Sequence, residues 1–357
     1  MKIETTAATL LMCALITLSS CTKKPHTPTE DPQPAEVGFT AASQAVWVKG
    51  ETDPKTTFPY TDFGVWGIAR NTSVASPYIL WTSNQLTEVS APEGTQTNKE
   101  ETNIVFTPTE AAYWLRDYSY DFLAIAPYNP GLTNVAFTLK DAAGNTTGKD
   151  YMTFTYDMSS KYASGDYAFD LLGAAAQYKV ETGGYSTAQN LMFWHLLSQI
   201  SFELKFGTDA TGQQINGTVK AVSLSLRPEA SFSILHDDES TQSTAPLHTE
   251  ANATQAQTVS VPLAVTANAS TYYAGPINIV PQTPADLILT VDFELEESEE
   301  SKVDYSLDLD LAAAQISEKY LSNNRYSYRI TIGTNASIAF YVTVNQDWAK
   351  EDGEINM

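Results

Sequence analysis

The chain has only two cysteines among its 357 residues, Cys13 and Cys21, and both lie close to the N-terminus. This scarcity excludes a disulfide framework in the rest of the chain. It also excludes a cysteine nucleophile and a thiolate metal site there. The fold must therefore be stabilised by packed hydrophobic cores.

Basic residues and histidines are also few. The chain has 20 lysines and arginines against 42 acidic residues, and its formal net charge is -22. An acidic chain repels nucleic acid, so no nucleic-acid partner is expected. The HExxH and GxSxG motifs are missing, and His195 lies among large apolar residues, as is typical of a core histidine. The sequence predicts neither an enzyme, nor a metal site, nor a cofactor.

Long apolar runs are missing too. The apolar segment at residues 7–18 is too short to span a bilayer and lies where a signal peptide has its apolar core. It ends in Leu18-Ser19-Ser20-Cys21, the lipobox pattern of a bacterial lipoprotein. We therefore expect a signal peptide at residues 1–20 and lipidation of Cys21, with the membrane bound through palmitate-like chains. An ordinary secretory signal with an accidental cysteine is the alternative.

Alternation of apolar and polar residues is abundant. Clear examples occur at residues 200–206, 287–295, 305–311 and 326–332. A period of two places one set of side chains in a core and the other in solvent. Many such segments, separated by turn residues, predict an all-β protein with a β-sandwich in each half. Helix is expected only as one or two turns within residues 187–199 and a short helix at 312–321.

Composition also predicts the domain limits. Four prolines and few apolar residues make residues 21–36 an extended tether. The segment 181–190 is the best candidate for a linker. We therefore expect an N-terminal β-sandwich at residues 37–186 and a C-terminal β-sandwich at 187–357.

Several segments, in order along the chain, carry a resemblance to a known family. They are VGFT (37–40), FGVWGIA (63–69), YDFLAIAPY (120–128), DLL (170–172), FWHLLSQISF (193–202), YSYRITI (326–332), residues 338–344 and Trp348. Together, behind a lipobox, they resemble the fimbrillin family, the subunits of type V pili. The resemblance implies two transthyretin-like β-sandwich domains in tandem.

The resemblance also implies a function. Family members are exported as lipoproteins to the outer membrane and the cell surface, and they form fimbria that support adhesion. In shaft subunits a trypsin-like protease removes the first strand, and a strand from another subunit fills the groove. The implied partners are other fimbrial subunits, in a homo- or hetero-polymer, and a host or bacterial surface ligand.

The family pattern can be placed on particular residues. The removable strand would cover residues 37–48, with Val37, Phe39 and Ala41 as the side chains withdrawn from the groove. Lys49, Lys55 and Arg70 are the basic residues placed for proteolytic maturation. The family's usual arginine soon after the first strand is replaced here by AASQ.

Three alternatives remain open at this point. An uncut subunit would keep its lipid and serve as an anchor. A surface lipoprotein could bind polysaccharide through exposed aromatic residues, since the chain has 19 tyrosines and 6 tryptophans. A glycosidase would need two paired carboxylates, which one acidic sequence does not reveal. Whether the subunit belongs to the shaft, the tip or the anchor is also open.

Overall fold

The computed structural model describes residues 35–43, 58–71, 77–89, 105–141, 143, 148–180, 188–235, 247–251, 256–264, 270–298, 301–314, 320–333 and 338–345. Residues 35–357 form one compact unit. Its described part is built from strands, with one short helix, α1 (Ser159–Ser164), and two 3-10 turns, η1 (Pro284–Asp286) and η2 (Leu311–Ala314). The all-β prediction is confirmed. No helix among these residues is long and apolar enough to cross a membrane.

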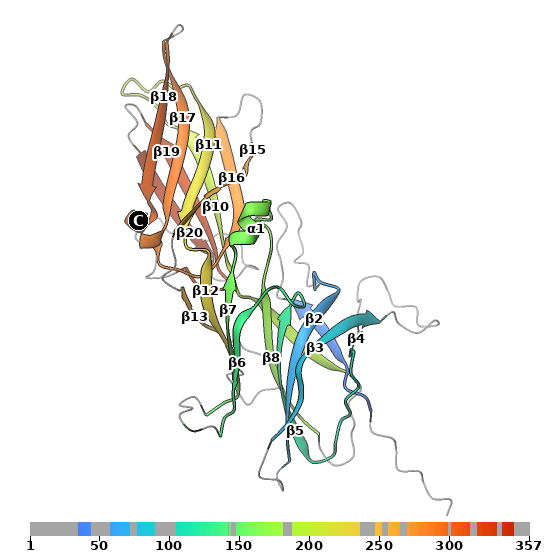
Figure 1. Cartoon of the computed structure of the whole chain (residues 1–357). Helices are drawn as coiled ribbons and strands as arrows, with labels where there is room; N and C mark the ends of the chain where they lie inside the picture. The colour runs from blue at the N-terminus through green and yellow to red at the C-terminus, as the bar shows by residue number, and fades with distance from the viewer. Residues whose placement is uncertain are drawn as a thin grey trace, which may run out of the picture. The chain divides into compact units, whose positions relative to one another are not determined.

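The N-terminal sandwich takes the form of a closed barrel, with neighbouring strands in the order β1-β4-β3-β2-β5-β8-β9 (Figure 1). The first strand therefore closes the barrel between two strands that are distant from it in sequence. The barrel strands are β1 (Phe39–Ser43), β2 (Asp62–Asn71), β3 (Tyr78–Val89), β4 (Val105–Pro108), β5 (Tyr118–Ala126), β8 (Leu172–Lys179) and β9 (Gln189–His195).

A second sheet, in the order β13-β12-β7-β6, belongs to the same compact unit. Trp66 of β2 and Leu123 of β5 share a hydrophobic core with Phe154 and Phe232 of this sheet, whereas Phe63 and Phe122 belong to the barrel core. Both faces of β2 and β5 are therefore buried, which explains their continuous apolar runs. The four strands are β6 (Thr133–Thr138), β7 (Tyr151–Asp157), β12 (Glu229–Leu235) and β13 (Leu247–Ala251).

The C-terminal sandwich packs a sheet in the order β15-β16-β10-β19-β20 against one in the order β14-β11-β17-β18. Leu289, Val291 and Phe293 are fully buried while the residues between them are not, as the alternation predicted. The strands are β10 (Ser198–Phe206), β11 (Gly217–Leu226), β14 (Gln257–Ser260), β15 (Leu263–Ala264), β16 (Thr271–Ile279), β17 (Ile288–Ser298), β18 (Ser301–Asp310), β19 (Arg325–Ile332) and β20 (Ile338–Asn345).

The helix predictions were less accurate than the strand predictions. Residues 189–195, where helical turns were expected, form strand β9. At 312–321 the described residues show only the end of the 3-10 turn η2. The predicted limits at 20, 36 and 186 remain predictions, and strands from both sides of residue 187 share the sheet β13-β12-β7-β6.

Candidate strand-exchange site

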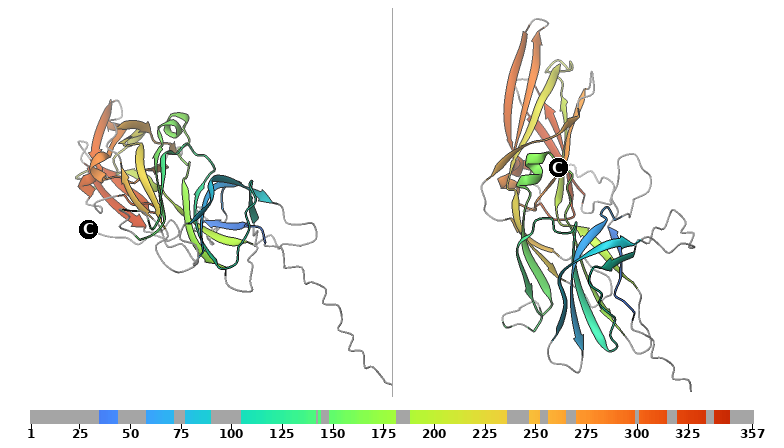
Figure 2. Two further views of the ribbon diagram at one scale, coloured as in Figure 1. Left: turned by 60° about the horizontal axis from the view of Figure 1, so that its bottom comes forward. Right: turned by 45° about the vertical axis from the view of Figure 1, so that its right-hand side comes forward.

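Strand β1 lies between β4 and β9 and is hydrogen-bonded to both. It pairs with β4 in an antiparallel register at Phe39 and Thr40, and with β9 in a parallel register along all five of its residues. The left view of Figure 2 shows the blue strand β1 beside the yellow-green β9. Just before β1, the backbone N–H of Val37 donates to the Ala112 carbonyl at 2.7 Å. The segment 35–43 is thus held by backbone ladders on both sides.

The side chains of this segment alternate toward the barrel core. Val37 and Phe39 are both 0% exposed, and the half-buried Ala41 packs against the same core. The Phe39 ring meets the Phe122 ring edge-on, with 4.9 Å between the ring centroids. It also lies 6.4 Å from the ring centroids of Phe63 and Trp81. Phe39 therefore fills an aromatic pocket in the middle of the barrel.

Strand β9 depends on β1 for most of its ladder. Its pairing with β8 is limited to His195 opposite Leu172 and Trp194 opposite Gly173. The rest of β9, from Gln189 to Phe193, pairs with β1. Removal of β1 would therefore open the barrel between β4 and β9 and leave both strands with unpaired backbone groups.

Phe58 marks the point where the described chain resumes after β1. Its ring lies 4.8 Å from the centroid of Phe193 and 5.5 Å from that of Phe106, and the residue is 8% exposed. The candidate cleavage residues Lys49 and Lys55 lie before Phe58, in the stretch 44–57 that is outside the described residues, as is Cys21. A cut at either lysine would keep Phe58 attached to the barrel.

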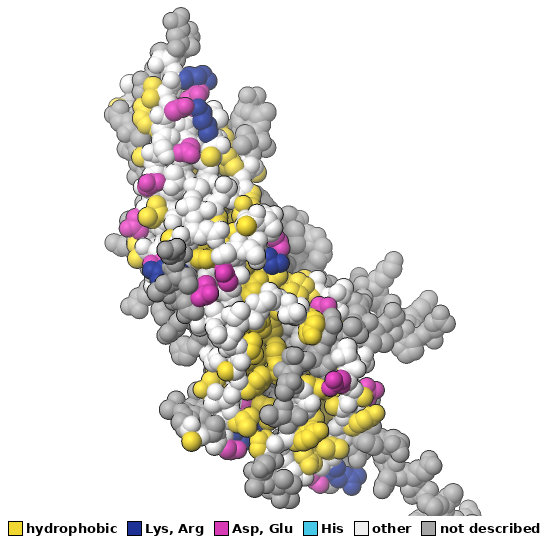
Figure 3. All heavy atoms as spheres, in the orientation of Figure 1, with side chains coloured by type: hydrophobic (Ala, Val, Ile, Leu, Met, Phe, Trp, Pro, Cys, Tyr) yellow, Lys and Arg dark blue, Asp and Glu magenta, His cyan; other side chains and the backbone are white. Residues whose placement is uncertain are grey.

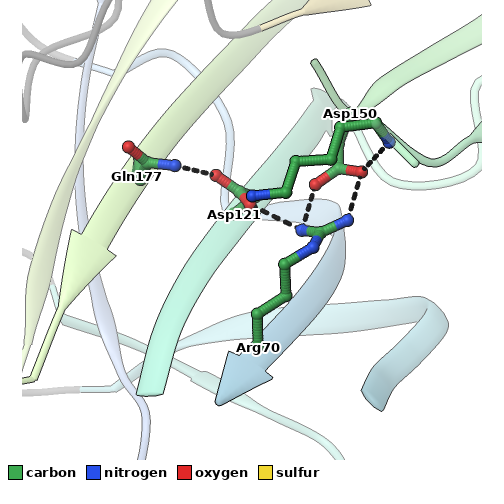
Figure 4. A network of polar contacts seen from close by, with 5 residues as sticks. Arg70, Asp121, Asp150 and Gln177 are labelled. Atoms are coloured by element: carbon green, nitrogen blue, oxygen red, sulfur yellow. Dashed lines mark hydrogen bonds and ion pairs between the residues drawn. The ribbon is translucent and has the colours of Figure 1, made fainter. Parts of the chain in front are cut away.

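Arg70, the third candidate for maturation, lies near the end of β2 in a network of buried carboxylates (Figure 4). Its Nη1 donates to Asp121 Oδ2 at 2.9 Å, and its Nη2 donates to Asp150 Oδ1 at 2.5 Å. Gln177 Nε2 of β8 donates to the other Asp121 oxygen at 2.7 Å. The Arg70 side chain is 11% exposed and that of Asp150 only 2%. The network joins β2, β5 and β8 to the residue before β7.

Burial raises the pKa of Asp121 to about 6, and the neighbouring Asp150 carboxyl adds to the rise. Gln177 and Arg70 act in the opposite direction without cancelling it. Because the folded pKa exceeds the unfolded value, folded Asp121 holds its proton over a pH range in which unfolded Asp121 has lost it. The stability that this proton contributes is present below about pH 4 and is lost as the pH rises toward 6.

An Asp121→Asn variant should lack this pH dependence. Relative to the variant, the wild type should lose about 1–3 kcal/mol of unfolding free energy between pH 4 and pH 7. Urea unfolding followed by tryptophan fluorescence at both pH values measures the difference. Asp304→Asn is the control, because the Asp304 side chain is 73% exposed. Parallel pH profiles for the wild type and Asp121→Asn would contradict the expectation.

Among the residues that the structure describes, the remaining candidates are a buried histidine and exposed tyrosines. His195 is 1% exposed and its Nδ1 contacts the Asp170 carboxylate, so the prediction of a core histidine is confirmed. The exposed tyrosines Tyr78, Tyr113 and Tyr273 belong to β3, the segment before β5, and β16. Figure 3 shows hydrophobic side chains gathered over the barrel half of one face, and charges of both signs over β17 and β18.

The position of β1 and the aromatic core that it covers define an all-β structural protein whose first strand closes its barrel. The chain belongs to the fimbrillin-like family, whose sequence profile matches residues 61–348. This family is structural and not enzymatic. The chain is therefore a fimbrial subunit or anchor with a cell-surface location. No curated protein matches it.

Solved structures of fimbrial proteins align with most of this chain. A fimbrial protein from Bacteroides vulgatus aligns with a TM-score of 0.52 at 13% identity, over 87% of this chain and 99% of that one. The fimbrial anchor protein Mfa2 from Porphyromonas gingivalis aligns at 11% identity and a TM-score of 0.35, over 87% of this chain and 96% of its own. The first of these likenesses establishes the fold alone.

Two parts of the candidate site were not predicted from the sequence. The first is β9, which is the longer wall of the groove; the alternation of Leu191, Phe193 and His195 is the signal that could have found it. The second is the network around Arg70. Its carboxylates are 51 and 80 residues away along the chain, and no local pattern links them.

Proposed function

We propose that this protein is exported as an outer-membrane lipoprotein and works in a cell-surface fimbrium whose subunits join by donor-strand complementation. In a cut chain, β1 leaves the barrel and a strand of another subunit takes its place. The observation that carries the proposal is the position of β1 between β4 and β9, with Phe39 buried among aromatic rings.

The physical driving force follows from what β1 covers. Without β1, the facing edges of β4 and β9 expose unpaired N–H and C=O groups, and an aromatic pocket opens to solvent. An incoming strand restores the ladders with its backbone and fills the pocket with alternate side chains. Because donor and acceptor surfaces differ, repeated addition builds a filament and not a closed dimer.

Maturation is best placed at Lys49 or Lys55. A cut after Arg70 would also remove β2, which lies between β3 and β5 and carries much of the barrel core. The guanidinium of Arg70 is also bound by two carboxylates, and a trypsin-like specificity pocket would have to compete with them. A cut at Lys49 or Lys55 would release β1 and keep β2 and Phe58.

Whether the chain keeps the lipid on Cys21 distinguishes two roles, that of an anchor and that of a polymerising subunit. An uncut chain keeps Cys21 and stays in the outer membrane as an anchor. It would bind the next subunit through its surface, because its own groove is still filled by β1. A cut chain loses the lipid together with β1 and becomes a polymerising subunit. Other fimbrial subunits are the partners in both cases, and a host or bacterial surface molecule is the ligand for adhesion.

Mass spectrometry of the native N-terminus tests this choice. Acylated Cys21 is expected for an anchor, and a start at Gly50 or Thr56 for a polymerising subunit. Native trypsin treatment of the chain from residue 22, followed by size-exclusion chromatography, provides the matching assembly assay. Cleavage within residues 44–57 that yields neither polymers nor a released β1 would count against strand exchange.

Polysaccharide binding is the second candidate function, and the exposed side chain of Tyr78 favours it, with an exposure of 61%. Exposed aromatic rings stack on sugar faces. Glycan-array binding by the wild type that is lost in Tyr78→Ala would support this function. Tyr113 and Tyr273 serve as comparison positions, because they are 48% and 45% exposed.

A further inference from the structure

We infer that the groove between β4 and β9 accepts a strand in one direction only and selects it by a single aromatic anchor at the position of Phe39. This inference rests on the proposed strand exchange and specifies the partner. The occupant is an extended segment of a different subunit that carries a valine-sized residue, an aromatic ring and an alanine-sized residue at alternate positions.

The direction follows from the two ladders. The walls of the groove differ, because β4 runs antiparallel to the occupant and β9 runs parallel to it. Antiparallel and parallel ladders space their hydrogen bonds differently. A reversed strand would have to form a parallel ladder with β4 and an antiparallel one with β9. The bonds between the occupant and β9, such as that from Gln189 N–H to the Gly38 carbonyl at 2.9 Å, would then lose their register.

The anchor follows from the shape of the core. The occupant side chains at positions 37 and 39 are completely buried, whereas the one at 41 is only half-buried. The pocket at position 39 is bounded by three aromatic side chains, those of Phe63, Trp81 and Phe122. A smaller side chain at this position would leave a cavity that the closed barrel cannot collapse around.

The chain itself contains this pattern once. Among its 14 phenylalanines, only Phe39 has a valine two residues before it and an alanine two residues after it. A second copy of the chain could therefore offer this exact pattern only by giving up its own β1. For this reason we infer that the donor is a strand of a different kind of subunit.

The occupant also holds β9 in place. Residues 189–193 pair with β1, and β8 meets β9 at only two positions. Backbone amides of residues 189–193 should therefore be protected from hydrogen exchange when the groove is filled and should exchange when it is empty. This gives a readout of correct insertion that is independent of binding strength.

A peptide-exchange experiment tests the inference. A site-specific protease sequence is placed within residues 44–57 of the chain from residue 22, and the cut protein is incubated with fluorescent peptides. The reference peptide is residues 35–43, AEVGFTAAS. The variants are Phe39→Ala and the matched control Thr40→Ser. Strand direction is measured by energy transfer between a dye on the first or the last residue of the reference peptide and a dye on Tyr113→Cys, because Tyr113 pairs with Glu36 just before β1. Fluorescence anisotropy measures exchange, and hydrogen exchange measures the protection of β9.

We expect the reference and Thr40→Ser peptides to exchange and to protect residues 189–193. The Phe39→Ala peptide should bind at least about 100-fold more weakly, as expected for an aromatic side chain deleted from a closed core. Energy transfer to position 113 should be strong from the first residue of the peptide and weak from the last, because an extended strand rises about 3.3 Å per residue. Binding of the Phe39→Ala peptide within about threefold of the reference, or equal energy transfer from the two ends of the reference peptide, overturns the inference but leaves strand exchange intact. Failure of the reference peptide to exchange overturns the proposed function and the inference with it.

Discussion

Replacement of Phe39 by alanine in the uncut chain should lower the free energy of unfolding by about 3–5 kcal/mol. The ring is fully buried and lies 4.9 Å, edge-on, from Phe122, at the centre of a barrel that closes around it. Deletion of the ring removes buried apolar area and leaves a cavity lined by aromatic side chains, which cannot move together to fill it. The barrel of the variant should therefore unfold at a lower urea concentration than that of the wild type.

Urea unfolding followed by near-ultraviolet circular dichroism, together with hydrogen exchange of β9, measures this effect. Thr40→Ser is the matched control on the same strand, because Thr40 is half-buried and keeps its hydroxyl in the variant. Its stability should stay within about 0.5 kcal/mol of the wild type. A loss below about 1 kcal/mol in Phe39→Ala would show that Phe39 does not anchor β1 in the barrel.

Replacement of Arg70 by methionine should also cost about 3–5 kcal/mol at pH 7, because it leaves two buried carboxylates without their cation. Asp150 is 2% exposed and Asp121 is 9% exposed at the side chain, so water cannot replace the guanidinium. Acidification should reduce the loss, since a protonated Asp121 can donate a hydrogen bond to Asp150. The pKa of Asp121 is already raised to about 6 in the wild type.

Thermal unfolding at pH 5 and pH 7 separates this explanation from a simple packing defect. Arg329→Met is the matched control: its side chain is 45% exposed, and its ion pair with Glu203 is long, at 3.9 Å. The control should change stability by less than about 1 kcal/mol at either pH. A loss in Arg70→Met that is equal at both pH values would show that the uncompensated charge is not its cause.

The period-two segments of the C-terminal half were recognised from the sequence because their signal is local. In β17 and β19, buried and less buried side chains alternate along the strand, and no distant residue is needed to see it. The continuous apolar run FLAIA in β5 is also a local signal, one that is typical of a strand buried on both faces. Which element covers its second face was not visible, because the sheet β13-β12-β7-β6 is assembled from two separate parts of the chain.

Strand β9 shows why the rest could not be predicted. The run from Met192 to Leu197 is apolar almost without interruption, and such a run fits a buried helix as well as a buried strand. Pairing with β1, about 150 residues earlier, decides in favour of the strand. The wall of the groove is thus created by a contact that local propensity does not encode.

Local chemistry was enough to establish the all-β class and the order of the family segments, because each depends on residues that are close together along the chain. Only the folded chain brings β1 between β4 and β9 and places Arg70 against Asp121 and Asp150. Judged by the alternation of apolar and polar residues alone, many segments of the chain could occupy the position of β1 in the barrel. The packing of Phe39 against rings from three other strands selects one of them, and that choice exists only in three dimensions.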